Sequence, residues 1–132
     1  MVLIIALALA LAAFSCKDPD PPNHSTITAF GKTITVKGDA SISTANFNTA
    51  RGKLQEAMTA LNTISPGLQR DKYISMVNRT GFAILIKTGN ASPDVDANKS
   101  MTIGVDYLLA NNAEPTIAQA IDDKVYADAF AD

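Results

Sequence analysis

Apolar and polar residues alternate along the stretch TITAFGKTITVK, residues 26–37. A period of two is typical of a β-strand with one buried face. A two-residue turn at Gly31-Lys32, with glycine first as a type II′ turn prefers, folds the stretch into a β-hairpin. In that register the apolar residues pair on one face, with Ala29 opposite Ile34 and Ile27 opposite Val36. The other face carries mainly threonine.

The next segment has the period of an α-helix. Ser43 or Thr44 offers an N-cap, and Ser65-Pro66-Gly67 provides a stop. Between them, apolar residues recur about every 3.6 positions and form one stripe: Phe47, Ala50, Leu54, Ala57, Met58, Leu61 and Ile64. Such a stripe indicates packing against a core, and a partner-binding face is the alternative.

Residues 68–88 predict a second helix followed by a buried strand. The helix spans residues 68–79 and turns Tyr73, Met76 and Val77 inward, and Gly81 can supply its left-handed end. The stretch FAILIKT at residues 82–88 is almost uniformly apolar, as expected of a strand in the centre of a sheet.

The last third of the chain predicts another strand and a final helix. Apolar residues alternate through MTIGVDYLLA, residues 101–110, which predicts a strand paired with residues 82–88. Pro115 suits the first position of a helix. Three apolar residues share one face of that helix: Ile117, Ile121 and Val125.

Together these segments predict the order ββααββα. A chain of 132 residues has room for one core. We therefore expect a single α+β domain over residues 26–132, with an antiparallel sheet and helices packed on one of its faces.

The start of the chain has a different character. The run from Val2 to Phe14 is entirely apolar. It is too short for a membrane-spanning helix, which needs about 20 residues, but it fits the apolar core of an export signal, about 7–15 residues long. Ser15 and Cys16, the only cysteine, follow it.

The stretch Ala13-Phe14-Ser15-Cys16 resembles the lipobox of bacterial lipoproteins, where a signal peptidase cuts before the cysteine. The resemblance implies that residues 1–15 are a signal peptide and that Cys16 is acylated, so that membrane lipid is a partner. It also implies export to the cell membrane or the outer membrane. Residues 16–25, rich in proline, then form a flexible tether. The alternative is an incidental thiol beside an ordinary secretion signal.

The charge of the chain argues against nucleic acid as a partner, because the net value is −2. Residues 32–87 carry eight Lys/Arg against three Asp/Glu, whereas residues 88–132 carry two against eight. Either the basic residues form a face for an anionic partner, or the two halves complement each other across the fold. The basic candidates are Arg51, Lys53, Arg70, Lys72 and Arg79.

The sequence offers no catalytic set. Its only histidine, His24, lies in the predicted tether, and Cys16 lies at the predicted anchor, so neither a Ser–His or Cys–His pair nor a zinc site can be assembled. Glycines are scattered singly, which argues against a phosphate-binding loop. We therefore expect no catalytic residue, no cofactor and no metal.

Residues 92–106 are the segment closest to a ligand-binding motif. Oxygen-bearing side chains alternate as in the first half of a calcium loop, at Asp94, Asp96, Asn98 and Ser100. However, Lys99 stands where such a loop needs glycine, and Val105 stands where it needs a bidentate glutamate. We expect a polar connection between two strands here. Whether Asp94, Asp96 and Asn98 bind a cation is left open by the sequence.

The expected function is therefore that of a non-enzymatic lipoprotein, a binding or structural module of the bacterial envelope. One alternative is a small hydrolase that uses carboxylates such as Asp94, Asp96 or Asp106. Another is a subunit or an inhibitor within an envelope protein complex.

Overall fold

A computed structural model describes residues 23–95 and 100–128. The predicted signal peptide, Cys16 and most of the predicted tether lie outside this part of the chain. The first strand begins at His24, so the fold includes Asn23, His24 and Ser25, which the sequence assigns to the tether.

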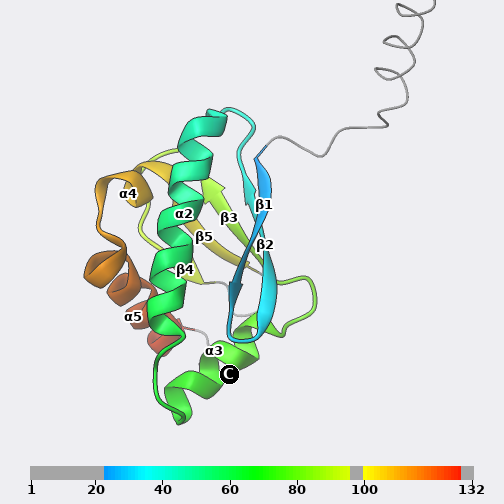
Figure 1. Ribbon diagram of the computed structural model, residues 1–132, viewed down its shortest axis with the longest axis vertical. Helices are drawn as coiled ribbons and strands as arrows, with labels where there is room; N and C mark the ends of the chain where they lie inside the picture. The colour runs from blue at the N-terminus through cyan, green and yellow to red at the C-terminus, as the bar shows by residue number, and fades with distance from the viewer. Residues whose placement is uncertain (1–22, 96–99, 129–132) are drawn as a thin grey trace, which may run out of the picture.

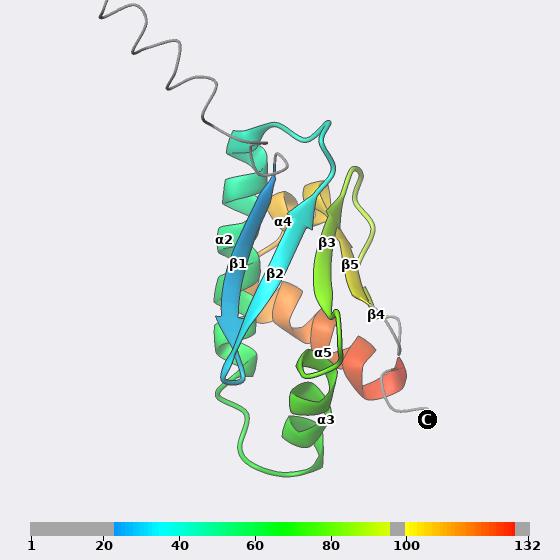
Figure 2. The same cartoon turned by 90° about the vertical axis from the view of Figure 1, so that its right-hand side faces the viewer.

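A five-stranded sheet forms one layer of the domain (Figure 1). Its strands, from one edge to the other, are β1 (His24–Ala29), β2 (Lys32–Gly38), β3 (Ala83–Lys87), β5 (Ser100–Gly104) and β4 (Asp94–Val95). The helices are α2 (Thr44–Leu61), α3 (Leu68–Val77), α4 (Val105–Ala110) and α5 (Ala118–Asp128), with a kinked helical turn η1 (Ala113–Ile117) before α5. Viewed from the open side of the sheet, α2, α4 and α5 lie behind it and α3 lies below it (Figure 2). The α+β class is confirmed. The predicted order ββααββα is wrong, because the structure adds the strand β4 and the helix α4 and has the order ββααβββαα.

The sheet is mixed, so the prediction of an antiparallel sheet is wrong. The β1–β2 and β4–β5 pairs are antiparallel, but β2 pairs with β3 and β3 pairs with β5 in parallel. The chain crosses over through α2 and α3 between β2 and β3, and a strand that returns by a crossover enters in the same direction. The short β4 takes a place outside β5, so β5 also runs parallel to β3. The central position predicted for residues 82–88 is confirmed, because β3 is the middle strand.

The hairpin prediction is right about the faces but wrong about the turn. Its central residues are Phe30 and Gly31, with φ angles of 53° and 74°, and Ile27 lies opposite Ile34. This register is offset by two residues from the predicted one, so the same side chains still face the core. Phe30 adopts a left-handed backbone because its ring stacks on Tyr73, with centroids 4.7 Å apart. Its N–H also donates to Asn62 Oδ1 at 2.9 Å.

Residues 101–110 form a strand only in their first half, and the strand predicted over the second half is wrong. From Val105 the chain is helical, with Val105 and Leu108 buried one helical turn apart. The loop that follows β3 sets this change. Gly104 N–H donates to the Ala91 carbonyl at 2.8 Å, and Asp106 N–H donates to the Gly89 carbonyl at 2.9 Å. The second bond occupies an N–H of the first helical turn that has no partner within the helix.

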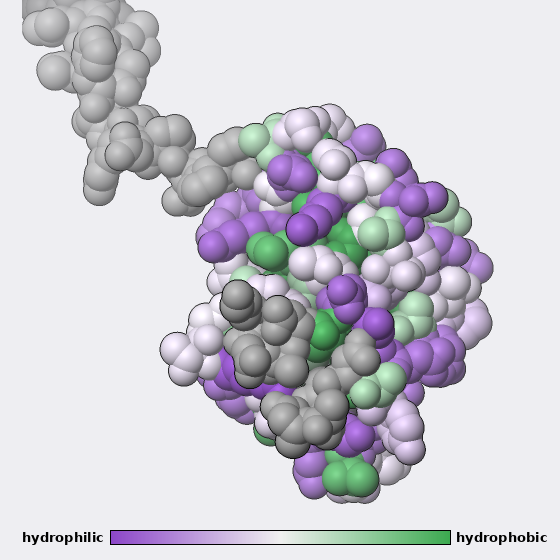
Figure 3. Space-filling model, turned by 180° about the vertical axis from the view of Figure 1, so that it is seen from behind, coloured by the Kyte–Doolittle hydropathy of each residue, from purple (hydrophilic) through white to green (hydrophobic). Residues whose placement is uncertain are grey.

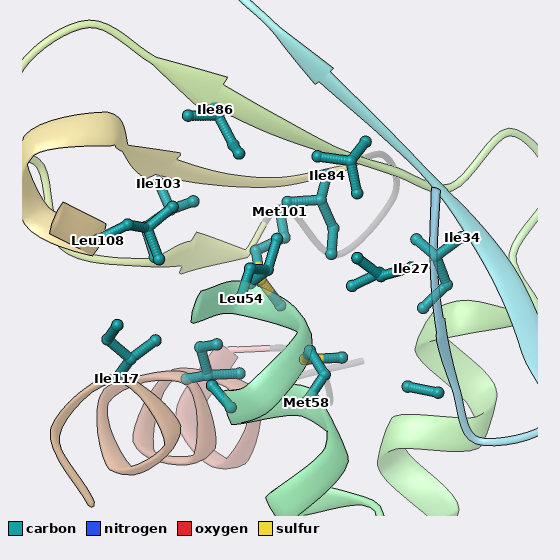
Figure 4. Packing of buried hydrophobic residues seen from close by; sticks show 14 of the residues in the cluster. Ile27, Ile34, Leu54, Met58, Ile84, Ile86, Met101, Ile103, Leu108 and Ile117 are labelled. Atoms are coloured by element: carbon teal, nitrogen blue, oxygen red, sulfur yellow. The ribbon is translucent and has the colours of Figure 1, made fainter. Parts of the chain in front are cut away.

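The two long helices confirm the predicted stripes. Ser43 caps α2, accepting from the Asn46 N–H at 3.2 Å, and all stripe residues except the half-buried Ile64 are buried. In the last helix the inward face is confirmed, and a helical backbone resumes at Pro115 after the extended Glu114. These side chains meet the apolar face of the sheet in one core (Figure 4), which includes Ile27, Ile34, Leu54, Met58, Ile84, Met101 and Ile117.

Candidate functional site

A groove runs along the surface between α2 and the segment that contains η1 and α5. Its larger hollow has a volume of about 750 Å³ and is open to solvent. Most of its lining residues have polar side chains. They are Lys53, Gln55, Glu56 and Thr59 of α2, Thr63 just after α2, and Asn112 and Glu114 of the facing segment. Both walls are fixed to the core, through Ala57 and Met58 on one side and Ile117 on the other.

A smaller hollow of about 300 Å³ continues this groove, since Ala60 and Glu114 line both. Its lining is more apolar and includes Leu61, Ile64, Pro115 and Ala118. The groove therefore has a polar half and an apolar half, and Glu114 stands where they meet.

Lys53 joins the two walls of the groove. Its Nζ donates to the carbonyl oxygens of Leu109 and Asn111, at 3.2 and 2.7 Å. These carbonyls lie at the end of α4, where a lysine is favourable because the last carbonyls have no partner within the helix. The two acidic side chains of the larger hollow, Glu56 and Glu114, are both exposed.

Asp122 lies in the smaller hollow and is held from behind by α3. Its Oδ1 accepts from Tyr73 Oη at 2.7 Å and from Gln69 Nε2 at 2.8 Å. Burial, together with the hydrogen bond and the charge of Asp122, raises the pKa of Tyr73 far above its ordinary value. Tyr73 therefore keeps its proton and acts as a fixed donor, which orients the carboxylate and joins α3 to α5.

Of the carboxylates singled out from the sequence, Asp94 and Asp106 belong to the described residues. Asp94 is exposed on β4 and forms an ion pair with Lys124 of α5, at 3.5 Å. Asp106 is exposed in the first turn of α4, and neither residue lines the groove. Asp96 and Asn98 lie outside the described residues. Across residues 23–95 and 100–128, no group of three or more His, Cys, Asp or Glu side chains is placed to hold a metal ion.

The basic residues singled out from the sequence mostly contact backbone carbonyls of the same chain. Arg51 donates to Thr26 at 3.3 Å, and Arg70 donates to Asn62 and Ile64 at 2.7 and 2.9 Å. Lys72 donates to the Tyr126 carbonyl and lies 4.5 Å from the centroid of its ring. In these contacts the basic side chains bond to carbonyl groups of the fold, which is a different role from the predicted pairing of charges between the two halves.

Lys53 is the one groove residue among the candidate site residues named from the sequence, and the groove itself was not predicted. Gln55 and Thr59 lie on the polar side of α2, and Thr63 follows four residues later, just after the helix ends at Leu61. By pattern alone this polar side is a solvated face. Only the packing of η1 and α5 beside α2 turns that face into a wall.

The part of the chain that the structure describes contains no helix with the length and apolar character needed to cross a membrane. Comparisons with protein-family models, with curated proteins and with solved structures give no match to this chain.

Proposed function

We propose that this chain is a non-catalytic binding module of the bacterial envelope, exported and anchored through an acylated Cys16, and that the groove beside α2 receives a segment of a partner protein. The groove carries the proposal. Its larger hollow, about 750 Å³, lies within the size range of ligand sites, roughly 300–1,000 Å³. The lipobox-like sequence at Cys16 supports the anchor.

The lining of the groove indicates the chemistry of the partner segment. Glu56 and Glu114 come from opposite walls, and Nζ of Lys53, which also lines the hollow, is bonded to backbone carbonyls. The two carboxylates outnumber this one cation, so the hollow favours a lysine or arginine side chain. The neighbouring Leu61, Ile64 and Pro115 suit an apolar side chain. A segment with a basic residue close to an apolar one matches both halves, and the amides and hydroxyls of Gln55, Thr59 and Asn112 can bond to its backbone.

The described side chains support binding better than catalysis. A general acid or base needs a pKa near the working pH and a proton that is free to move. Tyr73 stays protonated, and one oxygen of Asp122 already accepts two hydrogen bonds.

Peptide selection tests the groove. We expect the immobilised chain to enrich, from a random peptide library, peptides with lysine or arginine near an apolar residue. Combining Glu56→Lys with Glu114→Lys should weaken their binding by about tenfold or more, because attraction becomes repulsion. Combining Asp39→Lys with Asp71→Lys makes the same charge change at two exposed positions that do not line the groove, and it should leave binding unchanged. Equal binding by the groove variant, or no enrichment, would contradict the proposal.

The mass of the protein recovered from membranes tests the anchor. We expect a chain that begins at Cys16 and carries the added mass of acyl groups, whereas Cys16→Ala should keep residues 1–15. An unmodified cysteine in the mature protein would rule the anchor out.

A further inference from the structure

At Thr28, the outer edge of β1 is closed by one side chain of α2, that of Gln55. Thr28 N–H donates to Gln55 Oε1 at 2.9 Å, and Gln55 Nε2 donates to the Thr28 carbonyl at 2.9 Å. These are the two bonds that a neighbouring antiparallel strand makes with one residue of an edge strand. The glutamine amide therefore occupies the place of a sixth strand.

Other side chains of the same helix region extend this closure. Arg51 donates to the Thr26 carbonyl at 3.3 Å, and Asn62 accepts from Phe30 N–H at 2.9 Å. Gln55 is itself held in place, because Nε2 also donates to Thr59 Oγ1 at 2.9 Å. Four outward backbone groups thus have partners: the N–H groups of Thr28 and Phe30 and the carbonyls of Thr26 and Thr28.

The edge that lies beneath these contacts is self-complementary. Thr28 presents both a donor and an acceptor outward, so two copies of β1 related by a two-fold axis can place Thr28 opposite Thr28 and form two mutual bonds. The strand HSTITA has six residues and is rich in threonine and isoleucine, which favour strand pairing. Exposed edges of this kind pair with other chains unless they are covered.

We infer that the β1 edge is a strand-pairing surface whose partner is a second copy of this chain, and that Gln55 keeps this surface closed. The groove is not involved in this step, although Gln55 also lines it, because strand pairing needs only the backbone of β1. Removal of the Gln55 amide frees the N–H and the carbonyl of Thr28, the two groups at the centre of the two-fold pair. In the resulting dimer with a continuous sheet, bonds from the second copy replace the contacts of Arg51 and Asn62 at Thr26 and Phe30.

The oligomeric state of the full chain in detergent tests the inference, with light scattering used to separate protein mass from detergent mass. Wild type should stay monomeric, and Gln55→Ala should show a doubling of protein mass that grows with concentration. Gln119→Ala is the matched control, because this glutamine lies on α5 and donates to Asp123. A Gln55→Ala variant that folds and stays monomeric at every concentration would overturn the inference.

A second variant distinguishes strand pairing from other association. Thr28→Pro removes the N–H that a second β1 would need, so adding it to Gln55→Ala should restore the monomer. A dimer that persists would overturn the inference. Hydrogen exchange of the Thr28 amide gives an answer from wild type alone. We expect this amide to be protected in the monomer, and exchange as fast as in an unfolded chain would show that Gln55 does not close the edge.

Discussion

The two edges of the sheet are protected in different ways (Figure 2). The β1 edge has six residues, and Arg51 and Gln55 of α2 bond to its outward backbone groups. The β4 edge has two residues, Asp94 and Val95, and the ion pair of Asp94 with Lys124 joins it to α5. A short edge offers few backbone groups for pairing, so it needs little cover, whereas a long edge needs a helix beside it.

The space-filling view from the side opposite to Figure 1 shows a surface where polar residues surround small apolar areas (Figure 3).

The β1 end and the β5 end of the sheet also contact the rest of the chain in different ways. On the β1 side, a large side chain closes the contact, since Phe30 fills the space between the hairpin turn and Tyr73. On the β5 side, two backbones meet directly. A β-carbon on Gly104 would collide with the Gly89 carbonyl oxygen and the Ala91 nitrogen. The first contact depends on buried ring area, and the second on the absence of a side chain.

Phe30→Ala should remove the ring contact at the β1 end of the sheet and give the largest loss of unfolding free energy. Loss of a buried ring costs about 3–5 kcal/mol of unfolding free energy. The left-handed backbone, which Phe30 adopts at a φ of 53°, would no longer be held by stacking. Urea denaturation measures the loss, and Lys32→Ala, an exposed change two residues away, should shift stability by less than about 0.5 kcal/mol. Similar losses for the two variants would contradict the role of the ring.

Gly104→Ala should overpack the contact between β5 and the loop at residues 89–91. The expected loss of unfolding free energy is about 1–3 kcal/mol, because the backbone atoms of this loop cannot move aside as a side chain can. Gly52→Ala is the matched change in α2, where nothing lies within 4 Å of an added β-carbon. It should raise stability by about 0.5–1 kcal/mol. The comparison fails if both changes shift the denaturation midpoint in the same direction.

Tyr73→Phe should lower the free energy of unfolding by about 1 kcal/mol, because the hydrogen bond to Asp122 that joins α3 to α5 is lost. The folded protein raises the pKa of Tyr73, so above about pH 10 the unfolded chain loses this proton and the folded chain keeps it. Stability from this group is complete below that pH and falls as the pH rises.

Denaturation midpoints measured between neutral and strongly alkaline pH test this sign. Wild type should lose stability more steeply than Tyr73→Phe above about pH 10. Parallel curves for the two proteins would show that Tyr73 ionises in the folded state as it does in the unfolded one.

Local patterns were reliable guides where a single face is buried. Ser43, the stripe from Phe47 to Leu61 and the inward face of α5 could be predicted, because each depends on neighbours in sequence. The turn at Phe30 could not, because Tyr73 and Asn62 decide it from other parts of the chain. The groove was equally hidden, since Thr59 and Thr63 have no signal apart from polarity until Glu114 lies opposite them.

The sequence by itself determined the α+β class, the positions of the long helices, the apolar face of the hairpin and the central place of β3. These features follow from period and apolar content, which are properties of each segment alone. Tertiary structure alone decided that β2, β3 and β5 run in parallel, that residues 105–110 are helical and that α2 closes the β1 edge. Strand direction and edge closure depend on which segments become neighbours, and alternation in sequence is the same for a strand that runs either way.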